Sequence, residues 1–297
     1  MRRIGIIGIG LLGSAIASRL LHAGYEVAGF DLRPDALKSL AAEGLRQADG
    51  LASAAEGAEA VLVVLPTLES VEAVFLGPGG LFASAPPSAV LIQMSTISPE
   101  LTQRLAAGAA GNGYRFLDAP VSGTSLMVAR GDSTVLVGGD EATLALCRDL
   151  FSALAGKTEF VGPVGSASLA KLATNLLVAL NTAALAEALV LAAKGGIPPA
   201  RMLELLSGSA AASRMMEIRG PLMVAGSYPP QMKLELFLKD LRLMTEEAER
   251  LGVALPLTEA ARELFNAAGE DGATLGVGGK DLAVVHAYLE KLAGLKR

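Results

Sequence analysis

The sequence predicts an α/β domain built on a parallel sheet, followed by an all-α domain. In the first half, short apolar segments alternate with helical patterns, which is typical of parallel strands connected by helices. After Gly162-Pro163-Val164-Gly165 the strand-like segments disappear and long helical patterns follow. We therefore expect an N-terminal domain over 1–162 and an all-helical domain over 163–297 that begins with a long interdomain helix.

Each expected element is a run of consistent hydrophobic periodicity, bounded by glycine, proline or polar residues. The near-continuous apolar run AVLVVL within 60–65 is typical of a strand buried on both faces. Strands are expected at Ile4–Ile7, Glu26–Asp31, Ala60–Leu65, Val90–Gln93, Arg115–Leu117, Thr134–Val137 and Glu159–Val161. Helices are expected at Ser14–Ala23, Pro99–Ala109, Glu141–Leu154, Ser166–Lys194, Pro199–Leu206, Leu234–Leu251, Leu257–Ala268 and Asp281–Leu292.

Composition narrows the class of protein. The 297 residues are 52% hydrophobic and 19% charged, as expected for a globular chain that buries sizeable cores. The net charge is −5 and the basic residues are scattered, which argues against a nucleic-acid partner. Cys147, the single cysteine, is expected to be a buried packing residue in a reducing, cytoplasmic setting. No set of cysteines, histidines and carboxylates has metal-ligand spacing, so no metal is expected.

Two apolar segments need a test for export or membrane insertion. The run that starts at Ile4 is broken by three glycines within 8–13, and no cleavage site follows, so we expect no signal peptide. Leu169–Ala193 is long enough to span a bilayer. It carries Lys171 and Glu187, however, and charges inside a membrane are rare and costly. We expect a helix buried between domains or subunits, and no membrane.

The strongest motif lies at the start of the chain. The first strand runs into Gly8-Ile9-Gly10-Leu11-Leu12-Gly13 and then a helix, which is G-x-G-x-x-G in the context that dinucleotide binding requires. Gly8 would allow the tight turn, Gly10 the approach of a pyrophosphate to the backbone, and Gly13 close packing of helix on strand. The amides that open the helix would face the phosphates. A glycine-rich turn without a ligand is the alternative, but the strand, helix and following acid favour a Rossmann domain.

That acid is Asp31, at the end of the second strand. Its carboxylate can accept hydrogen bonds from the adenosine ribose hydroxyls and would repel a 2′-phosphate, which favours NAD. Arg33 could instead bind that phosphate, so NADP stays open. Leu65, Pro66 and Thr96 follow later strands on the edge where open α/β sheets bind ligands, and we expect them to line the cofactor site.

Lys171 and Asn175 stand four residues apart in a predicted helix and therefore project from one face. An ammonium beside an amide is costly in a packed interface unless it is used. The alternative is a lysine whose stem is packed while its ammonium stays in water.

Several separated motifs, in order along the whole chain, resemble the β-hydroxyacid dehydrogenases, which include 3-hydroxyisobutyrate dehydrogenase and tartronate semialdehyde reductase. Besides the glycine turn they are Asp118-Ala119-Pro120-Val121-Ser122-Gly123, Gly162-x-x-Gly165 with Lys171-x-x-x-Asn175, Lys239-Asp240-Leu241, and Asp281-Leu282-Ala283-Val284. The resemblance implies a second domain like that of 6-phosphogluconate dehydrogenase. It also implies an oxidoreductase that moves a hydride between NAD(P) and a small β-hydroxyacid or its semialdehyde.

The resemblance also implies roles for individual residues. Lys171 would be the general acid/base, which requires its pKa to fall towards neutrality, as burial favours. Asn175 would orient the lysine or the substrate oxygen. Ser122, Gly123 and Thr124 would bind a substrate carboxylate, and Lys239 would close over the nicotinamide side. A homodimer or homotetramer is implied as well, and the apolar long helix favours it.

The chain departs from the family pattern beside the substrate motif. Thr124 stands where a second glycine is usual, and Ser125-Leu126-Met127 is bulkier than the usual small residues. The substrates of the best-known members therefore do not transfer, and the non-glycine residue is reminiscent of the branch that reduces glyoxylate and succinic semialdehyde. Lys171 argues against the imine reductases, which usually carry another residue there. The alternatives are a carbonyl or imine reductase on the same scaffold and a non-catalytic dinucleotide-binding sensor.

Overall fold

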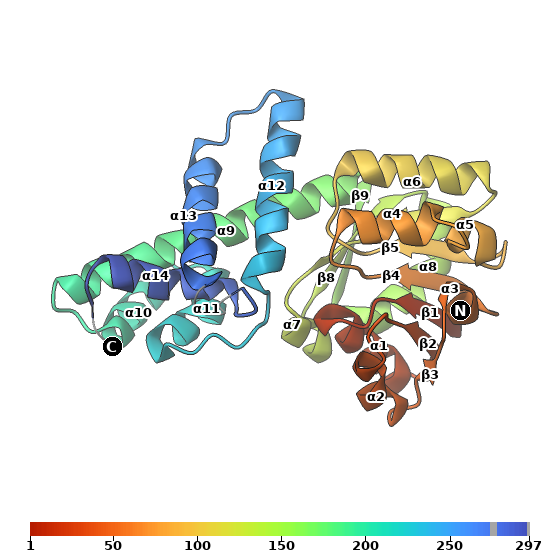
Figure 1. The fold of residues 1–297 in the computed structure, drawn as a ribbon, viewed down its shortest axis with the longest axis horizontal. Coiled ribbons are helices and arrows are strands. Elements are labelled where there is room, and N and C mark those ends of the chain that lie inside the picture. Colours follow the sequence, from red (N-terminus) through yellow and green to blue (C-terminus); the bar gives the residue numbers. More distant parts are fainter. Residues whose placement is uncertain (274–277, 296–297) are drawn as a thin grey trace. The chain divides into compact units, whose positions relative to one another are not determined.

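The structure is a computed structural model that describes residues 1–273 and 278–295. The chain divides into two compact units, Met1–Leu172 and Ala173–Arg297 (Figure 1). The division lies inside helix α9 (Ser166–Lys194), so the first turns of this helix pack with the first unit. The domain limits expected from the sequence, at residue 162, stay a prediction.

The described part of the first unit forms a nine-stranded sheet in the order β3-β2-β1-β4-β5-β6-β8-β7, with β9 beside β8. Its strands are β1 (Arg3–Ile7), β2 (Glu26–Phe30), β3 (Arg46–Gln47), β4 (Ala60–Val63), β5 (Val90–Gln93), β6 (Arg115–Asp118), β7 (Val121–Ser122), β8 (Thr134–Gly139) and β9 (Lys157–Gly162). From β3 to β6 all neighbours are parallel.

The prediction of a parallel sheet is wrong for one side of the sheet. Strand β8 is antiparallel to both β6 and β7, whereas β9 is again parallel to β8. The physical reason is the connection: α7 (Ser125–Arg130) and a short turn return the chain beside the strand it has just left. A parallel pair needs a crossover that carries the chain back to the starting edge.

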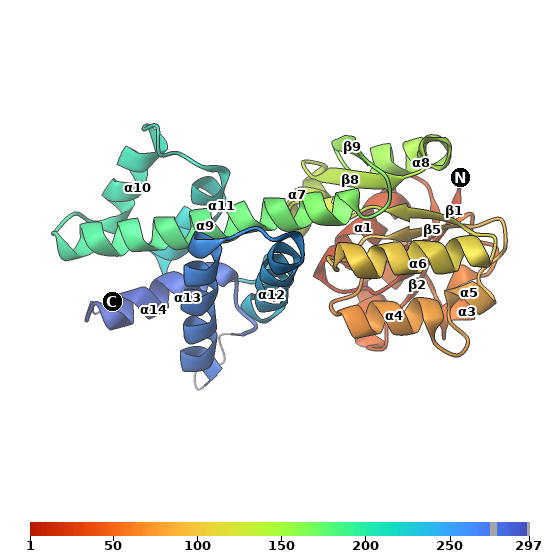
Figure 2. The same cartoon turned by 90° about the horizontal axis from the view of Figure 1, so that it is seen from above.

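Helices cover both faces of the sheet, because successive strand residues point to opposite sides. Ile4, Ile6 and Leu62 belong to one apolar core, and Val61 and Val63 to the other. The first core is closed by α1 (Leu11–His22), α2 (Asp35–Ala41), α7 and α8 (Glu141–Leu154). The second is closed by α3 (Leu51–Ala55), α4 (Leu68–Leu76), α5 (Leu81–Ser84) and α6 (Pro99–Gly111), of which α4 and α6 lie side by side in Figure 2.

The second unit is helical, as the sequence predicts. It contains the rest of α9, α10 (Pro199–Ser207), α11 (Arg214–Ala225), α12 (Leu234–Leu251), α13 (Pro256–Ala273), the 3₁₀ turn η1 (Leu282–Val284) and α14 (Val285–Leu292). Helices α12 and α13 pack through Phe237 and Phe265, whose rings meet edge to face with centroids 5.8 Å apart. The expected helices α8, α9 and α12 have the predicted bounds. Helix α11 was not predicted, because it carries Pro221 in its interior.

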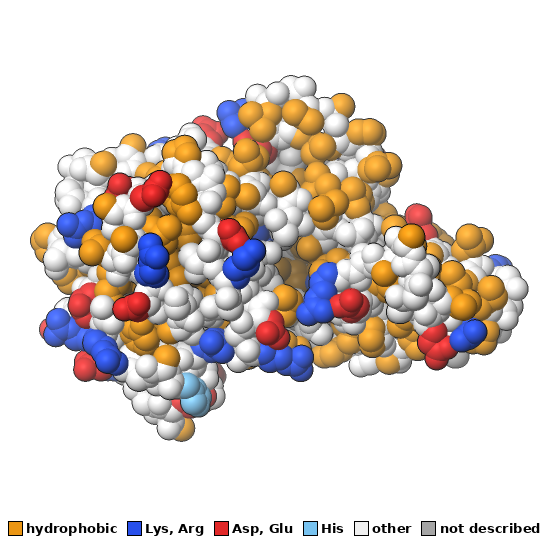
Figure 3. Space-filling view, turned by 180° about the vertical axis from the view of Figure 1, so that it is seen from behind, with side chains coloured by type: hydrophobic (Ala, Val, Ile, Leu, Met, Phe, Trp, Pro, Cys, Tyr) orange, Lys and Arg blue, Asp and Glu red, His pale blue; other side chains and the backbone are white. Residues whose placement is uncertain are grey.

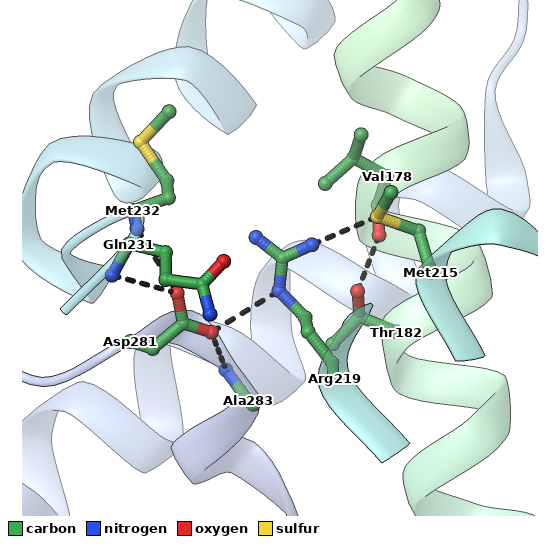
Figure 4. A network of polar contacts seen from close by, with 8 residues as sticks. All are labelled: Val178, Thr182, Met215, Arg219, Gln231, Met232, Asp281 and Ala283. Carbon is green, nitrogen blue, oxygen red and sulfur yellow. Dashed lines mark hydrogen bonds and ion pairs between the residues drawn. The ribbon is translucent and has the colours of Figure 1, made fainter. Parts of the chain in front are cut away.

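A buried ion pair between Arg219 and Asp281 joins distant segments of the helical unit (Figure 4). Arg219 Nε lies 3.1 Å from Asp281 Oδ1, and both side chains are almost wholly buried. Asp281 Oδ2 also accepts the Met232 N–H at 2.9 Å, just before α12 begins. Burial lowers the pKa of Arg219, and Asp281 opposes that shift. A single antiparallel bridge, Lys233 with Asp281, is the β-type pairing found outside the sheet in the described residues.

Helix α9 is the one helix among residues 1–273 and 278–295 that is long and apolar enough to cross a membrane by length and composition. Core helices of soluble proteins pass the same test. On the face drawn in Figure 3, acidic and basic side chains are interspersed over the surface and form no basic stripe.

Candidate active site

The glycine turn between β1 and α1 leaves no room for two side chains and ample room for one. A Cβ at Gly8 would lie 2.2 Å from the Val64 carbonyl oxygen, and φ is +97°. A Cβ at Gly13 would lie 2.0 Å from the Gly8 carbonyl oxygen, so glycine is required where the helix crosses the strand. At Gly10 the nearest atom would be Arg33 Nη2, at 4.0 Å. The turn therefore fits a pyrophosphate, which must approach the backbone at Gly10.

Asp31 lies directly after β2 and closes this turn. Its Oδ2 accepts the Ile9 N–H at 2.9 Å, and its Oδ1 accepts the Arg33 N–H at 2.8 Å. The Arg33 guanidinium lies 3.2 Å from Oδ1 and is itself exposed. Burial alone would raise the pKa of Asp31, but the hydrogen bonds from Arg33 and Ile9 hold this pKa below its usual value. An ionised carboxylate at this place suits ribose hydroxyls and disfavours a phosphate.

The ends of β4 and β5 lie at the same edge as Gly8, because β1, β4 and β5 are parallel neighbours. The Leu65 N–H donates to Ser95 Oγ at 2.8 Å, which joins the two strand ends. Pro66 and Thr96 follow in the same loops. These are the loops where open α/β sheets bind ligands.

The loop expected to bind substrate follows β6. Ser122 lies in β7, Gly123 has φ +147°, and Thr124 caps α7 by accepting the Met127 N–H at 3.3 Å. The departure from the family pattern thus has a structural reason. Threonine gives α7 a side-chain cap that glycine cannot, although the gain in stability over glycine at such a position is only about 0.3 kcal/mol.

Asp118, the last residue of β6, binds the start of α9. Its Oδ2 accepts the Gly165 N–H at 3.2 Å and the Ser168 N–H at 2.8 Å, and its Oδ1 accepts the Ser168 hydroxyl at 2.8 Å. Burial raises the pKa of Asp118 to about 6, against the opposing effect of these hydrogen bonds. No role for Asp118 or Ser168 was predicted from the sequence.

Lys171 lies one turn beyond Ser168 on the same helix, and its side chain is only 5% exposed. A lysine whose stem is packed while its ammonium stays in water is usually more exposed than this. Asn175, one further turn along, is 3% exposed.

Within the second unit, the Asp240 carboxylate contacts two of the expected site residues. Its Oδ2 accepts from Asn175 Nδ2 at 2.8 Å, and its Oδ1 lies 2.9 Å from Lys239 Nζ. Asp240 is buried and lies on α12, next to Lys239. Because the amide nitrogen of Asn175 faces Asp240, its amide oxygen points the other way. Asp240 belongs to the Lys239-Asp240-Leu241 motif, but no role for it was predicted from the sequence.

No metal site is evident in the described ranges, where no group of three or more His, Cys, Asp and Glu side chains could hold an ion. Cys147 is buried in the first core, as predicted, and burial raises the pKa of its thiol to about 12. A thiol in that state is a packing group.

Two family models cover nearly the whole chain. The NAD binding domain of 6-phosphogluconate dehydrogenase matches residues 3–162, and the NAD-binding domain of NADP-dependent 3-hydroxyisobutyrate dehydrogenase matches residues 165–287. The chain is 32% identical over 294 residues to 2-(hydroxymethyl)glutarate dehydrogenase of Eubacterium barkeri, which covers 99% of this chain and 96% of the relative. It belongs to the β-hydroxyacid dehydrogenase family.

Other β-hydroxyacid dehydrogenases agree with this placement. The 2-hydroxy-3-oxopropionate reductase of Escherichia coli is 34% identical, over 91% of this chain and 92% of the relative. A crystal structure of 3-hydroxyisobutyrate dehydrogenase from Salmonella typhimurium superposes with a TM-score of 0.88 at 31% identity, over 97% of this chain and all of that one. An imine reductase from Streptomyces aurantiacus has a TM-score of 0.64 at 20% identity and shares the fold alone.

As a β-hydroxyacid dehydrogenase, the chain is an NAD(P)-dependent oxidoreductase. The family resemblance read from the separated motifs is confirmed, and so is the Rossmann domain followed by a helical domain. The alternative function of an imine reductase is not favoured.

Proposed function

We propose that this chain oxidises a small 3-hydroxyacid, or reduces the matching semialdehyde, with Lys171 as its general acid/base. The observation that carries the proposal is a buried lysine, followed one turn later by a buried asparagine, on the helix that begins in the cofactor-binding unit. A buried amine is the kind of group whose pKa can fall into the working range of an acid/base catalyst.

The first unit supplies the residues that would hold the cofactor. Gly8, Gly10 and Gly13 shape the turn for the pyrophosphate, with the amides of Ile9, Leu11 and Leu12 around it. Asp31 would bind the adenosine ribose and favour NAD, whereas Arg33 leaves NADP possible. Leu65, Pro66 and Thr96 would line the nicotinamide end, and Lys239 of the second unit would approach the same end. When bound, the nicotinamide supplies the hydride acceptor or donor.

Lys171 moves the proton that accompanies the hydride. In oxidation, its neutral amine takes the proton of the substrate hydroxyl while the C–H electron pair leaves as hydride, so a C=O bond forms. In reduction, its ammonium gives a proton to the carbonyl oxygen as the carbon receives hydride. The Asn175 amide, fixed through Asp240, would orient the lysine or the substrate oxygen. Oxidation therefore needs Lys171 neutral, and reduction needs it protonated.

The substrate would carry a carboxylate bound by uncharged donors. Ser122 offers a hydroxyl, and Gly123 and Thr124 offer backbone N–H groups. Because the Thr124 oxygen already accepts a hydrogen bond from Met127 N–H, its hydroxyl has its proton left to donate. The matched relatives are named for 2-(hydroxymethyl)glutarate, L-threonate and 3-hydroxyisobutyrate, and we place the substrate of this chain among small hydroxyacids of that kind.

Replacement of Lys171 by alanine tests the proposal. Turnover is followed by reduced-nicotinamide absorbance with a panel of small hydroxyacids and semialdehydes, and cofactor binding by fluorescence. Lys171→Ala is expected to lower kcat by about 10²- to 10⁴-fold without loss of cofactor binding, since general acid/base catalysis contributes that much. Lys194→Ala is the matched control, because Lys194 is an exposed lysine on the same helix.

Two results would contradict the proposal. Near-normal turnover in Lys171→Ala would remove the lysine from the reaction. Tight cofactor binding by the unmodified chain, with no turnover of any substrate in the panel, would favour a dinucleotide-binding sensor instead.

We also propose a cytoplasmic homodimer or homotetramer that engages neither nucleic acid nor membrane. The support is the apolar surface of the second unit: Leu177 is 57% exposed, Leu191 76% and Leu257 70%. Exposed apolar surface of this kind is suited to contact with a second copy, and closed homo-oligomers are the commonest assemblies of one chain. Sedimentation velocity distinguishes these assemblies from a monomer.

A further inference from the structure

Asp118 connects two parts of the candidate site within the first unit. The chain that leaves it enters β7, which carries Ser122. Its carboxylate binds the first turn of α9, one turn before Lys171. The same residue thus anchors the substrate loop and the start of the helix that carries the lysine.

Two buried hydroxyl groups contact each other beside the Asp118 carboxylate. Ser168 has a single hydroxyl proton, and it donates this proton to Asp118 Oδ1 at 2.8 Å. Ser168 Oγ also lies 2.8 Å from Thr102 Oγ1, a contact in which either hydroxyl can be the donor, and Thr102 Oγ1 donates to the Ser98 carbonyl oxygen at 3.1 Å. A chain of hydroxyl contacts thus connects Thr102 on α6, through Ser168 on α9, to the carboxylate on β6. All three side chains are buried.

Backbone packing holds the same turn from other sides. A Cβ at Gly138 in β8 would lie 2.8 Å from the Pro163 carbonyl oxygen and 3.2 Å from the Ala167 nitrogen. A Cβ at Gly165 would lie 3.1 Å from Gln103 Nε2 on α6. The start of α9 therefore lies against β8 and α6 without free space, and the carboxylate fixes which residues of its first turn face the sheet.

We propose that Asp118, together with Ser168 and Thr102, positions Lys171 by fixing the first turn of α9 against the end of β6. The inference rests on the proposed role of Lys171 and assigns positioning residues to that same site. None of the three needs to touch the substrate.

The energetics of Asp118 support a functional reason for the carboxylate. Its ionised form is disfavoured by burial, as the raised pKa of about 6 indicates. At neutral pH the buried carboxylate lowers the stability of the fold more than an uncharged acceptor would. Residues that lower stability in this way are typical of functional sites, where activity is retained at the expense of stability. Only a carboxylate can accept all three donors without turning an N–H toward one of them.

Alanine variants of the three residues test the proposal, with Asp140 as the matched control. Asp140 also accepts a backbone N–H and a hydroxyl from one residue at the start of a helix, here Thr143 of α8, but α8 carries no candidate site residue. Removing a positioning contact is expected to lower kcat by about tenfold in Ser168→Ala and by about a hundredfold in Asp118→Ala. Asp118→Asn should restore part of the loss, and Thr102→Val should show the smallest effect.

The dissociation constant of the reduced cofactor is expected to stay within about twofold of the unmodified value in every variant, since the glycine turn is untouched. Asp140→Ala should leave kcat per folded molecule unchanged. Equal losses of kcat in the Asp118 and Asp140 variants, or a loss confined to cofactor affinity, would overturn the proposal. If Asp118→Ala does not fold, Ser168→Ala and Thr102→Val carry the same test.

A double-mutant cycle separates this inference from the proposed function. If Ser168 acts through Lys171, Ser168→Ala should lower the residual turnover of Lys171→Ala no further. Additive losses would refute positioning while the role of Lys171 stands. Near-normal turnover in Lys171→Ala alone would refute the proposed function itself.

Discussion

Asp118 and Asp140 make nearly the same hydrogen bonds in two regions of the first unit. Each carboxylate accepts the backbone N–H and the hydroxyl of one residue in the first turn of a helix. Yet the pKa of Asp140 is lowered, by the hydrogen bonds from Thr143, whereas the pKa of Asp118 is raised, by burial. The difference teaches that desolvation, and not the local motif, decides whether a capping carboxylate stabilises the fold.

The largest effect is expected where the buried carboxylate is removed. Asp118→Ala leaves the Gly165 and Ser168 N–H groups and the Ser168 hydroxyl without their acceptor, inside the protein. Unpaired buried donors cost about 1–3 kcal/mol, so we expect Asp118→Ala to be about 3 kcal/mol less stable than Asp118→Asn in urea unfolding. Asp140→Ala leaves its donors in contact with water, so it should lose much less stability than Asp118→Ala. Equal losses of stability in Asp118→Ala and Asp140→Ala would contradict the difference between the two carboxylates.

The pH dependence of stability should have opposite signs at the two positions. The folded pKa of Asp118, about 6, lies above the usual 3.8. The folded state therefore binds the Asp118 proton more tightly than the unfolded state does. The contribution of this proton to the free energy of unfolding is fully present below pH 4 and is lost as the pH rises through 6, by about 3 kcal/mol at most. Asp140 has a lowered pKa, so its contribution is present above its usual pKa and is lost on acidification.

Urea unfolding from pH 4 to pH 8 checks this sign. Asp118→Asn should remove the loss between pH 4 and pH 6, and so become more stable than the unmodified chain at pH 8. Asp140→Asn should leave that loss in place. A pH profile of stability that Asp118→Asn does not change would show that the carboxylate is not desolvated as the structure indicates.

Asp31 lies between these two extremes and extends the comparison to a ligand. It is partly buried, accepts two backbone N–H groups and keeps a lowered pKa. Its ionised form should repel a 2′-phosphate, so Asp31→Asn should raise the ratio of kcat/KM with NADP to that with NAD by about tenfold, which is about 1.4 kcal/mol. Because asparagine keeps an acceptor for the Ile9 N–H, the free energy of unfolding should change less than the preference between NADP and NAD. Arg33→Ala is the companion variant, and it should lower the same ratio.

Local patterns were enough to predict much of the molecule. The glycine turn, the strands β1, β2, β4, β5 and β6 and the helices α8, α9 and α12 follow from periodicity and from glycine stereochemistry, which depend on neighbouring residues. The one-face placement of Lys171 and Asn175 follows from helix geometry for the same reason. Short helices such as α7 were missed, because a six-residue segment shows little periodicity.

The sequence by itself determined the order of the two folds and the glycine turn after β1, and it singled out the lysine that we propose as the acid/base. Only the tertiary structure decided that β8 runs antiparallel, that Asp118 meets a serine fifty positions away, and that Asp240 meets Asn175. In the sequence Asp118 and Asp140 are both aspartates that follow a strand. They differ in how much water reaches them, and solvent access is a property of the packed chain that no local pattern encodes.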